Sequence, residues 1–443
     1  MIIDLSIANF GPIKDKITLS FEPSGRSSSA IGLVEPIKGF PLLRYALIYG
    51  ANASGKSTIL KALDLLLALV NRPLDKKNDR IDNNPFKFSG STQNADTFFE
   101  LRFVSNNKKY GYSVSFNSRF VTTEHFYEIA DSGDVTIFTR RTDKDRQLPI
   151  ITFAPFVSDS AVTTILSGAT LWNNTVFGGF QKVSVDIPLL RQASEWFLTY
   201  CSRIIDPGKS LFDYVSRNID DDNISKSNIL SWLRNADLMI DDINIEIEKP
   251  SDQMAQGIVR MMRVFGQDNR PDSELLEQAK NFRRARVDFH HITPDGQEAE
   301  ISYEMESDGT QRFYQLAGVL DGLLKTNQHF SIDELDASLH PDLLEFFLET
   351  YLSGDSHSQL IATMHQRDLL MNSDIINPDA LWITQKNGEG ATELYSLSDF
   401  DDDIFLAADP SRKYYEAYRN GQLGGKPFLG VPSYNLRTDD ATE

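Results

Sequence analysis

The chain has 443 residues, of which 41% are hydrophobic and 24% are charged, so it is long enough for two or three lobes and has an ordinary globular composition. Its 63 acidic and 44 basic residues give a net charge of −19, which disfavours nonspecific adhesion to nucleic acid or anionic membrane, although a local basic stripe could still bind them. The single cysteine, Cys201, excludes an intrachain disulfide and a multi-cysteine metal centre. No secretory signal or membrane span is visible, so we expect a cytoplasmic protein without a membrane partner.

The first 155 residues are dominated by predicted strands. Apolar runs and alternating patterns indicate strands at residues 2–7, 17–21, 42–49, 97–104, 110–116, 120–129 and 135–140. Residues 58–70 predict a helix that stops before Pro73. We expect the strands from residue 97 onwards to form an antiparallel subdomain beside the buried strand 42–49.

Residues 156–285 change in character and predict a mainly helical insertion. Helices are expected at 171–172, 187–200, 229–238 and 273–284, with one alternating strand at 243–248. No internal repeat or sustained heptad pattern is present, which argues against a long coiled coil.

Sheet character returns in residues 286–400. Strands are expected at 287–292, 298–304, 329–333, 359–363 and 381–384, and helices at 309–326 and 341–352. The tail, residues 401–443, opens acidic and ends polar, and we expect its last dozen residues to be disordered.

The most specific motif is G-x-x-x-x-G-K-[ST], which residues 50–57 match at every fixed position. Its glycines let backbone amides turn around a polyphosphate, Lys56 supplies a point charge, Ser57 offers a hydroxyl to Mg²⁺, and the helix that follows points its positive end at the anion. The flanking strand and helix separate this match from a chance Gly/Ser turn. The expected ATP-binding residues are Gly50, Ala51, Asn52, Ala53, Ser54, Gly55, Lys56, Ser57 and Thr58.

Two acidic residues end the strand 329–333 and suggest the second half of the site. Asp333 is placed to hold Mg²⁺ together with Ser57, and Glu334 to orient and polarise an attacking water. His365 follows the strand 359–363, where an imidazole could touch the γ-phosphate. Alone, the acidic pair could be a solvated strand end and the histidine a structural one; their order along the chain favours function.

A third segment precedes a predicted helix and offers another anion site through a serine and backbone amides. Its residues are Ser307, Asp308, Gly309, Thr310 and Gln311. The order is therefore P-loop, Ser-x-Gly-x-Gln, Asp-Glu, then strand and histidine, with residues 335–341 directly after the acidic pair.

This order resembles the ABC-type ATPases, in the branch shared by SMC, RecF-like and OLD-like proteins. The resemblance is narrowest to the stand-alone AAA family ATPases of bacterial abortive-infection systems, similar to RloA and AbiL, through residues 7–10, 48–56, 85–86, 124–127, 138–140, 306–307 and 333–341. It implies an α/β fold: an ABC-type P-loop NTPase head with a mixed sheet, an antiparallel β subdomain and the inserted helical domain. It also implies a signature loop (residues 307–311) that completes the P-loop site of a second copy, and a D-loop with Asp336 and Ser338.

The family resemblance implies an ATP- and Mg²⁺-dependent homodimer or higher homo-oligomer that hydrolyses ATP and regulates a separate effector protein, a nuclease or toxin, in antiphage defence. The sequence departs from the family pattern in lacking the second glycine of the signature and an evident γ-phosphate-sensing glutamine, for which Gln93 is a weak candidate. We expect no Toprim nuclease domain after residue 400, and we expect any nuclease activity to come from a separate protein.

The main alternative is a RecF- or SMC-like ATPase that acts on DNA in repair or recombination. It is favoured by a basic cluster (Arg260, Arg263, Lys280, Arg283, Arg284 and Arg286) and opposed by the net charge and the missing coiled coil. A solvated helix face, on which Glu277 meets Lys280 one turn later, is the favoured explanation of the cluster, because charged helix faces are common. A nucleotide-binding scaffold without turnover is disfavoured because Glu334 is present.

Overall fold

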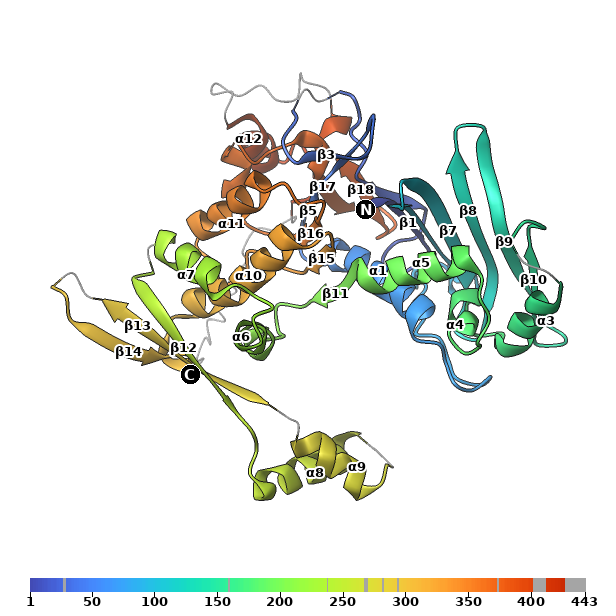
Figure 1. Cartoon of the computed structure of the whole chain (residues 1–443). Helices are drawn as coiled ribbons and strands as arrows, with labels where there is room; N and C mark the ends of the chain where they lie inside the picture. The colour runs from blue at the N-terminus through green and yellow to red at the C-terminus, as the bar shows by residue number, and fades with distance from the viewer. Residues whose placement is uncertain are drawn as a thin grey trace, which may run out of the picture.

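The computed structural model describes residues 1–26, 29–157, 160–236, 238–266, 270–280, 283–292, 295–372, 374–400 and 412–426, apart from the side chains of residues 264–266. These residues form a six-stranded, a seven-stranded, a three-stranded and a two-stranded sheet (Figure 1). None of the helices in these ranges combines the length and apolarity needed to cross a bilayer.

The six-stranded sheet is the centre of the molecule. Its order is β11 (Cys201–Ile205), β15 (His329–Ile332), β16 (Gln359–Thr363), β5 (Tyr45–Gly50), β17 (Leu381–Lys386) and β18 (Thr392–Ser396). The first five strands are mutually parallel and only β18 is antiparallel to its neighbour. The carboxyl ends of the parallel strands therefore meet at one edge, where α/β folds bind their ligands. The helices of this part are α1 (Lys56–Asn71), α10 (Asp308–Lys325), α11 (Pro341–Ser353) and α12 (Lys413–Asn420).

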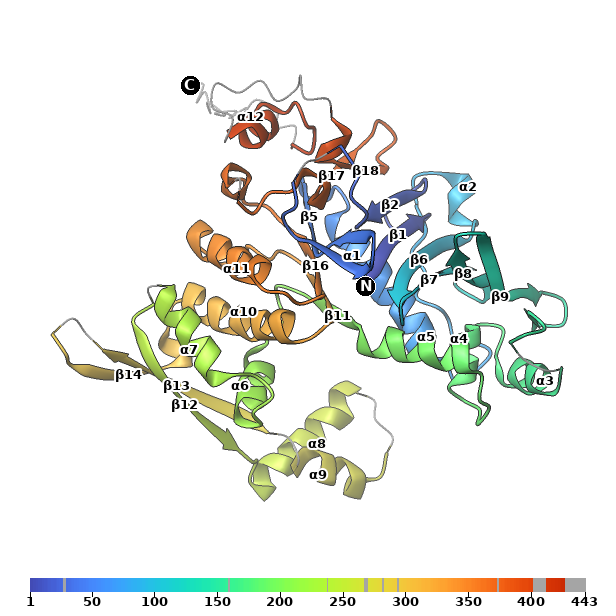
Figure 2. The ribbon, with the colours of Figure 1, turned by 45° about the horizontal axis from the view of Figure 1, so that its top comes forward.

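The seven-stranded sheet is antiparallel and lies beside the core (Figures 1 and 2). Its order is β10 (Leu148–Phe153), β9 (Gly133–Asp143), β8 (Val121–Ala130), β7 (Lys108–Phe116), β6 (Thr97–Ser105), β1 (Ile2–Ala8) and β2 (Ile17–Ser20). Its aromatic face packs on α4 (Val176–Phe180) and α5 (Pro188–Thr199), where the rings of Phe103 and Trp196 stack at 4.0 Å between centroids. Smaller elements are β3 (Leu33–Ile37), β4 (Phe40–Leu43), α2 (Gly90–Gln93) and α3 (Ser160–Ala169).

A buried ion pair fixes this subdomain. Glu124 and Arg140 are each 2% exposed and approach to 3.5 Å. The Glu124 carboxylate accepts hydrogen bonds from the Tyr112 hydroxyl and the Val176 amide at the start of α4. Burying either charge without these partners would destabilise the fold strongly. The ion pair therefore holds β8, β9 and α4 in one arrangement.

The third sheet forms a projection from the core. It consists of β12 (Ile240–Glu248), β13 (Arg284–Ile292) and β14 (Glu298–Ser302), with α6 (Phe212–Asp220) and α7 (Lys226–Asn235) at its base. The helices α8 (Asp252–Gly266) and α9 (Asp272–Lys280) occupy its far end (Figure 2).

The predicted α/β class, with a mixed sheet and an antiparallel β subdomain, is confirmed. Most predicted strands and helices are present, but three differences have clear causes. The strand 42–49 is interrupted at Arg44, whose buried guanidinium turns to the carbonyls of Tyr351 and Gly354. The helix at 171–172 is wrong: these residues form a turn, and Trp172 stacks on Phe120. The helix 273–284 stops at Lys280, and Arg284 already begins β13.

The middle of the chain also enters the core, because β11 is an edge strand of the six-stranded sheet. The division into lobes at 155, 285 and 400 thus stays a proposal. The expectation of disorder in the last dozen residues falls outside the described residues, whereas residues 412–426 contain α12 and pack on the core.

Candidate nucleotide-binding site

The loop of residues 50–55 joins β5 to α1 and requires its glycines. Gly50 and Gly55 have φ of 151° and 113°, and Ala53 has φ of 62°. A Cβ on Gly50 would lie 2.4 Å from the Thr384 carbonyl oxygen, and one on Gly55 would lie 2.4 Å from the Thr392 hydroxyl. The loop therefore passes close to β17 and β18 with a backbone that other residues rarely adopt.

Lys56 folds over this loop. Its ammonium donates hydrogen bonds to the carbonyls of Gly50 (2.8 Å) and Ala51 (3.2 Å), and the residue is 6% exposed. Burial lowers the pKa of Lys56, while the carboxylates of Asp333 and Glu334 act in the opposite direction. A cation held here by carbonyl oxygens is available to a terminal phosphate that enters the loop.

Ser57 and Asp333 meet across the sheet. The Ser57 hydroxyl donates to Asp333 Oδ1 at 2.8 Å, and the Thr363 hydroxyl donates to the same oxygen at 2.6 Å. Thr363 in turn accepts from the Glu334 amide at 2.7 Å. A hydroxyl and a carboxylate oxygen side by side are ligands that Mg²⁺ prefers, and the ion usually takes its remaining ligands from phosphate and water. The residues present therefore fit Mg²⁺.

Glu334 and His365 form the exposed part of this edge. Glu334 Oε1 lies 3.8 Å from His365 Nε2, and their side chains are 45% and 39% exposed. Glu334 has φ of 51°, a left-handed conformation that lifts its carboxylate out of the strand direction. Asp336, 5% exposed, accepts hydrogen bonds from the amides of His365 (2.7 Å) and Gln366, so it fixes the loop that carries the histidine.

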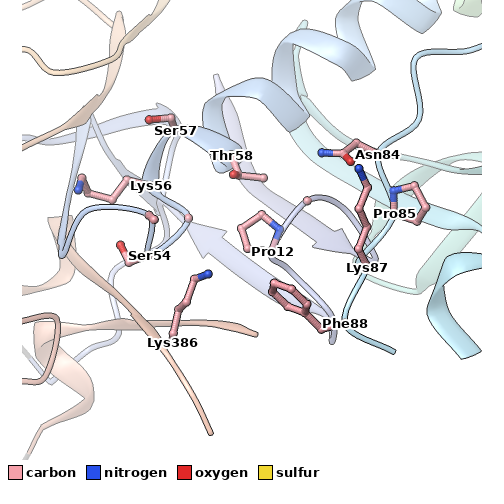
Figure 3. Close-up of a pocket in the computed structure, with 13 residues that line it drawn as sticks. Pro12, Ser54, Lys56, Ser57, Thr58, Asn84, Pro85, Lys87, Phe88 and Lys386 are labelled. Carbon is pink, nitrogen blue, oxygen red and sulfur yellow. The ribbon is translucent and has the colours of Figure 1, made fainter. Parts of the chain in front are cut away.

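A pocket of about 420 Å³ opens beside residues 53–58 (Figure 3). Its other wall comes from two loops that the sequence analysis did not assign to the site: the turn after β1 and the segment 84–88. The Gly11 amide donates to the Asn84 carbonyl at 2.6 Å, which joins the two loops. Phe88 is 73% exposed at this wall, and the Lys386 ammonium lies 5.9 Å from its ring centre. The additional lining residues are Gly11, Pro12, Asn84, Pro85, Lys87, Phe88 and Lys386.

Gln93, the weak candidate for a γ-phosphate sensor, does not line this pocket. Its side chain donates to the Lys87 carbonyl instead. Asn84 is the amide side chain that lies in the pocket (Figure 3). The pair Pro85 and Phe86 was noted in the sequence, but a loop without periodicity gave no indication that its neighbours face a ligand.

Residues 307–311 lie on a separate surface. Ser307 caps α10 by accepting a hydrogen bond from the Thr310 amide at 3.1 Å, and Ser307 and Asp308 are exposed. Gln311 donates to the Glu306 carbonyl. A Cβ on Gly309 would lie 3.5 Å from the carbonyl of Ser338, which has φ of 60°, so the two loops are adjacent. No pocket described around residues 50–58 includes residues 307–311.

Three comparisons place the chain among known proteins. Its structure resembles the SMC head domain from Thermotoga maritima (12% identity, 89% of this chain and 98% of that one, TM-score 0.37) and an Smc head with an extended coiled coil bound to the C-terminal domain of ScpA, from Pyrococcus furiosus (14%, 89% and 96%, TM-score 0.36). No curated protein matches the sequence. The family model described as "AAA domain, putative AbiEii toxin, Type IV TA system" matches residues 46–159 and 214–372, more than half of the chain. The chain therefore belongs to this family of AAA domains.

Proposed function

We propose that the chain is an ATPase that dimerises around ATP and regulates a separate effector, a nuclease or toxin, in antiphage defence. The observation that carries the ATPase part is the convergence of Lys56, Ser57, Asp333, Glu334 and His365 at the carboxyl ends of three parallel strands. The family match supports a nucleotide-dependent activity of this class.

Each side chain has a definite task in hydrolysis. Lys56 neutralises the outer phosphates, and Ser57 and Asp333 would hold Mg²⁺, which when bound neutralises charge on the phosphate oxygens. Glu334 accepts a proton from a water whose oxygen forms a bond to the γ-phosphorus as the bond to the β–γ bridging oxygen breaks. ADP and phosphate are the products. His365 is placed to hydrogen-bond the transferred phosphoryl group.

The dimer is proposed from a contact that a single chain does not make. Ser307 is exposed at the start of α10, and a helix N-terminus is a good phosphate contact, yet no pocket described around its own P-loop includes it. A second copy that faces the first in two-fold symmetry would bring each 307–311 segment to the other P-loop. The adjacent Ser338 loop would then also lie at the interface.

The defence role is supported by the resemblance to RloA and AbiL and by the family description, which names a type IV toxin–antitoxin system. The DNA-acting alternative loses its main support, since four of the six basic residues of the cluster have acidic partners. The ion pairs are Arg263–Asp272, Lys280–Asp252, Arg283–Asp221 and Arg286–Asp288. Lys280 thus pairs with Asp252 rather than with the Glu277 expected from helical spacing. A face neutralised in this way attracts phosphates weakly.

Mixing two inactive variants tests the shared site. Ser307→Arg should block hydrolysis by placing a bulky cation at the interface, and Lys56→Ala should abolish ATP binding. A heterodimer of the two contains one site with an intact P-loop and an intact signature, so mixing should restore part of the activity. If Ser307→Arg alone hydrolyses ATP, or if the mixture hydrolyses no more ATP than its two components, the sites are not shared between copies. Salt-sensitive DNA binding in a filter assay would instead favour the alternative.

A further inference from the structure

Residues 50–52 of the P-loop border another hollow, whose lining differs from that of the pocket in Figure 3. This pocket has a volume of about 680 Å³ and is bounded on one side by residues 50–52 of the loop. The opposite walls come from the segment after β16 and from the C-terminal residues of the described chain. The side chains and glycine that form these walls are His365, Arg367, Tyr418, Gly425 and Lys426.

The C-terminal wall is firmly built onto the core. Leu423 is 1% exposed and its carbonyl accepts a hydrogen bond from the Tyr395 hydroxyl at 2.8 Å, while the rings of Tyr418 and Tyr49 pack at 6.0 Å. Gly425 has φ of 66°, and a Cβ on it would lie 2.8 Å from Ile383 Cγ2 and 3.5 Å from Gly50 Cα. A glycine is needed for residues 412–426 to approach the P-loop this closely.

The walls are cationic although the whole chain is acidic. Two cationic side chains, Arg367 and Lys426, line this pocket with the His365 imidazole and no carboxylate, in a chain with a net charge of −19. The Glu334 carboxylate lies outside the lining, 3.8 Å from His365. Lys426 already donates to the backbone carbonyl of Arg419. Within the described part of the chain, the Arg367 guanidinium has neither a hydrogen bond nor an ion pair, and it is exposed toward the pocket. An unpaired guanidinium in a hollow whose lining contains no carboxylate is suited to an anion.

The position of Lys56 indicates which anion this is. Its ammonium sits on the carbonyls of Gly50 and Ala51, two of the residues that form the near wall. In a P-loop this lysine contacts the β- and γ-phosphates, so the terminal phosphate of bound ATP would lie beside Gly50 and Ala51, which also border the pocket lined by His365 and Arg367.

We propose that Arg367 is a catalytic residue that contacts the γ-phosphate of ATP held in its own P-loop. The inference rests on the proposed ATPase function and adds a cation supplied by the same chain. The guanidinium neutralises charge on the γ-phosphate oxygens while the bond to the bridging oxygen breaks and Glu334 takes the proton of the attacking water. ADP lacks this phosphate, so Arg367 distinguishes ATP from ADP.

Calorimetry on the full chain tests this with Arg367→Ala, placed both in the wild type and in a Glu334→Gln background that prevents turnover. In the Glu334→Gln background, ATP affinity should fall about 10- to 100-fold, as for loss of a charged hydrogen bond, and ADP affinity should stay unchanged. In the wild-type background, kcat should fall at least tenfold. Arg419→Ala is the matched control: it removes an exposed guanidinium from α12, outside the pocket lining, and keeps the backbone carbonyl. It should change neither affinity nor kcat.

An unchanged ratio of ATP to ADP affinity in Arg367→Ala would overturn the inference, as would an equal loss for both nucleotides or the same loss in Arg419→Ala. A parent chain that binds ATP without hydrolysing it would refute the proposed activity alone, because the affinity ratio still tests Arg367. A parent chain that binds neither nucleotide would refute both.

Discussion

The hydroxyl of Ser57 and the carboxylate of Asp333 share a 2.8 Å hydrogen bond although 276 positions separate them in the chain. The strands that precede them in the chain, β5 and β15, are not neighbours: β16 lies between and contributes Thr363 to the same carboxylate oxygen. Asp333 is thus oriented by two hydroxyls, with Oδ1 turned toward the P-loop. Because its carboxylate is already oriented, Asp333 loses little further side-chain conformational entropy when it binds a cation.

Asp333→Asn should weaken ATP binding at least tenfold in the presence of Mg²⁺, because the amide keeps the shape but loses the charge that holds the ion. When EDTA removes Mg²⁺, the ATP affinities of the variant and the parent should differ little. Titration calorimetry with and without Mg²⁺ measures both values. Asp252→Asn is the control, since it removes an exposed carboxylate at another helix start, that of α8. Equal Mg²⁺ dependence in Asp333→Asn and the parent would contradict a metal role.

Glu334→Gln should retain ATP binding and lose at least about 100-fold in kcat, the usual scale for a missing general base. Because the glutamine keeps the size of the side chain, the chain should accumulate as an ATP-bound dimer. Gel filtration with light scattering, with ATP and with ADP, would detect this dimer. A monomer with full hydrolysis would refute the assigned role.

Phe88 presents an exposed ring at the wall of the 420 Å³ pocket, beside Lys386, and we expect it to stack on the adenine base. Loss of one stacked base costs about 1–3 kcal/mol, so Phe88→Ala should weaken ATP roughly 10- to 100-fold. Tripolyphosphate, which has no base, should bind both proteins equally, and Phe88→Tyr should behave as the parent. A parallel loss of tripolyphosphate affinity would instead indicate collapse of the loop.

The parts of this site that consist of adjacent residues could be predicted from the sequence. A P-loop and an acidic strand end are recognisable because their chemistry is concentrated in a few adjacent positions, residues 50–57 and 333–334. The strand order that brings these segments together depends on long-range packing. Asn84 and Phe88 were missed because they come from a loop with no periodicity, and Lys386 because it ends β17 beyond the predicted strand 381–384. Backbone turns, rather than side-chain pattern, aim Asn84 and Phe88 at the pocket.

Edge elements were missed for a related reason. The strand β11 has only five residues, includes the polar Ser202 and Arg203, and directly follows the predicted helix 187–200. Only its pairing with β15 in the structure identifies it as a strand, because five residues are too few to show a hydrophobic periodicity. The contribution of residues 412–426 was equally invisible, because the glycines that let them approach the P-loop read as a turn.

His329 explains a polar interruption in the buried strand β15 and gives the chain a pH-sensitive stability. The residue is fully buried, its ring pairs with the Ser331 hydroxyl at 3.1 Å, and burial, with a smaller effect of the Met1 amine, lowers its pKa to about 3 from an ordinary 6.5. Between these values the unfolded chain binds a proton that the folded chain does not. The free energy of unfolding should therefore fall as the pH drops below 6.5, by an amount on the order of 2 kcal/mol from this residue at pH 5.

Urea unfolding at pH 7.5 and pH 5 measures this loss, and His329→Gln isolates it, since glutamine keeps a polar partner for Ser331 but does not titrate. The variant should be less stable than the parent at pH 7.5, where packing around the ring is lost, yet lose less stability between the two pH values. Parallel losses in parent and variant would mean that protons taken up elsewhere destabilise the fold. The pairing with Ser331 would then be ordinary polar packing without influence on acid sensitivity.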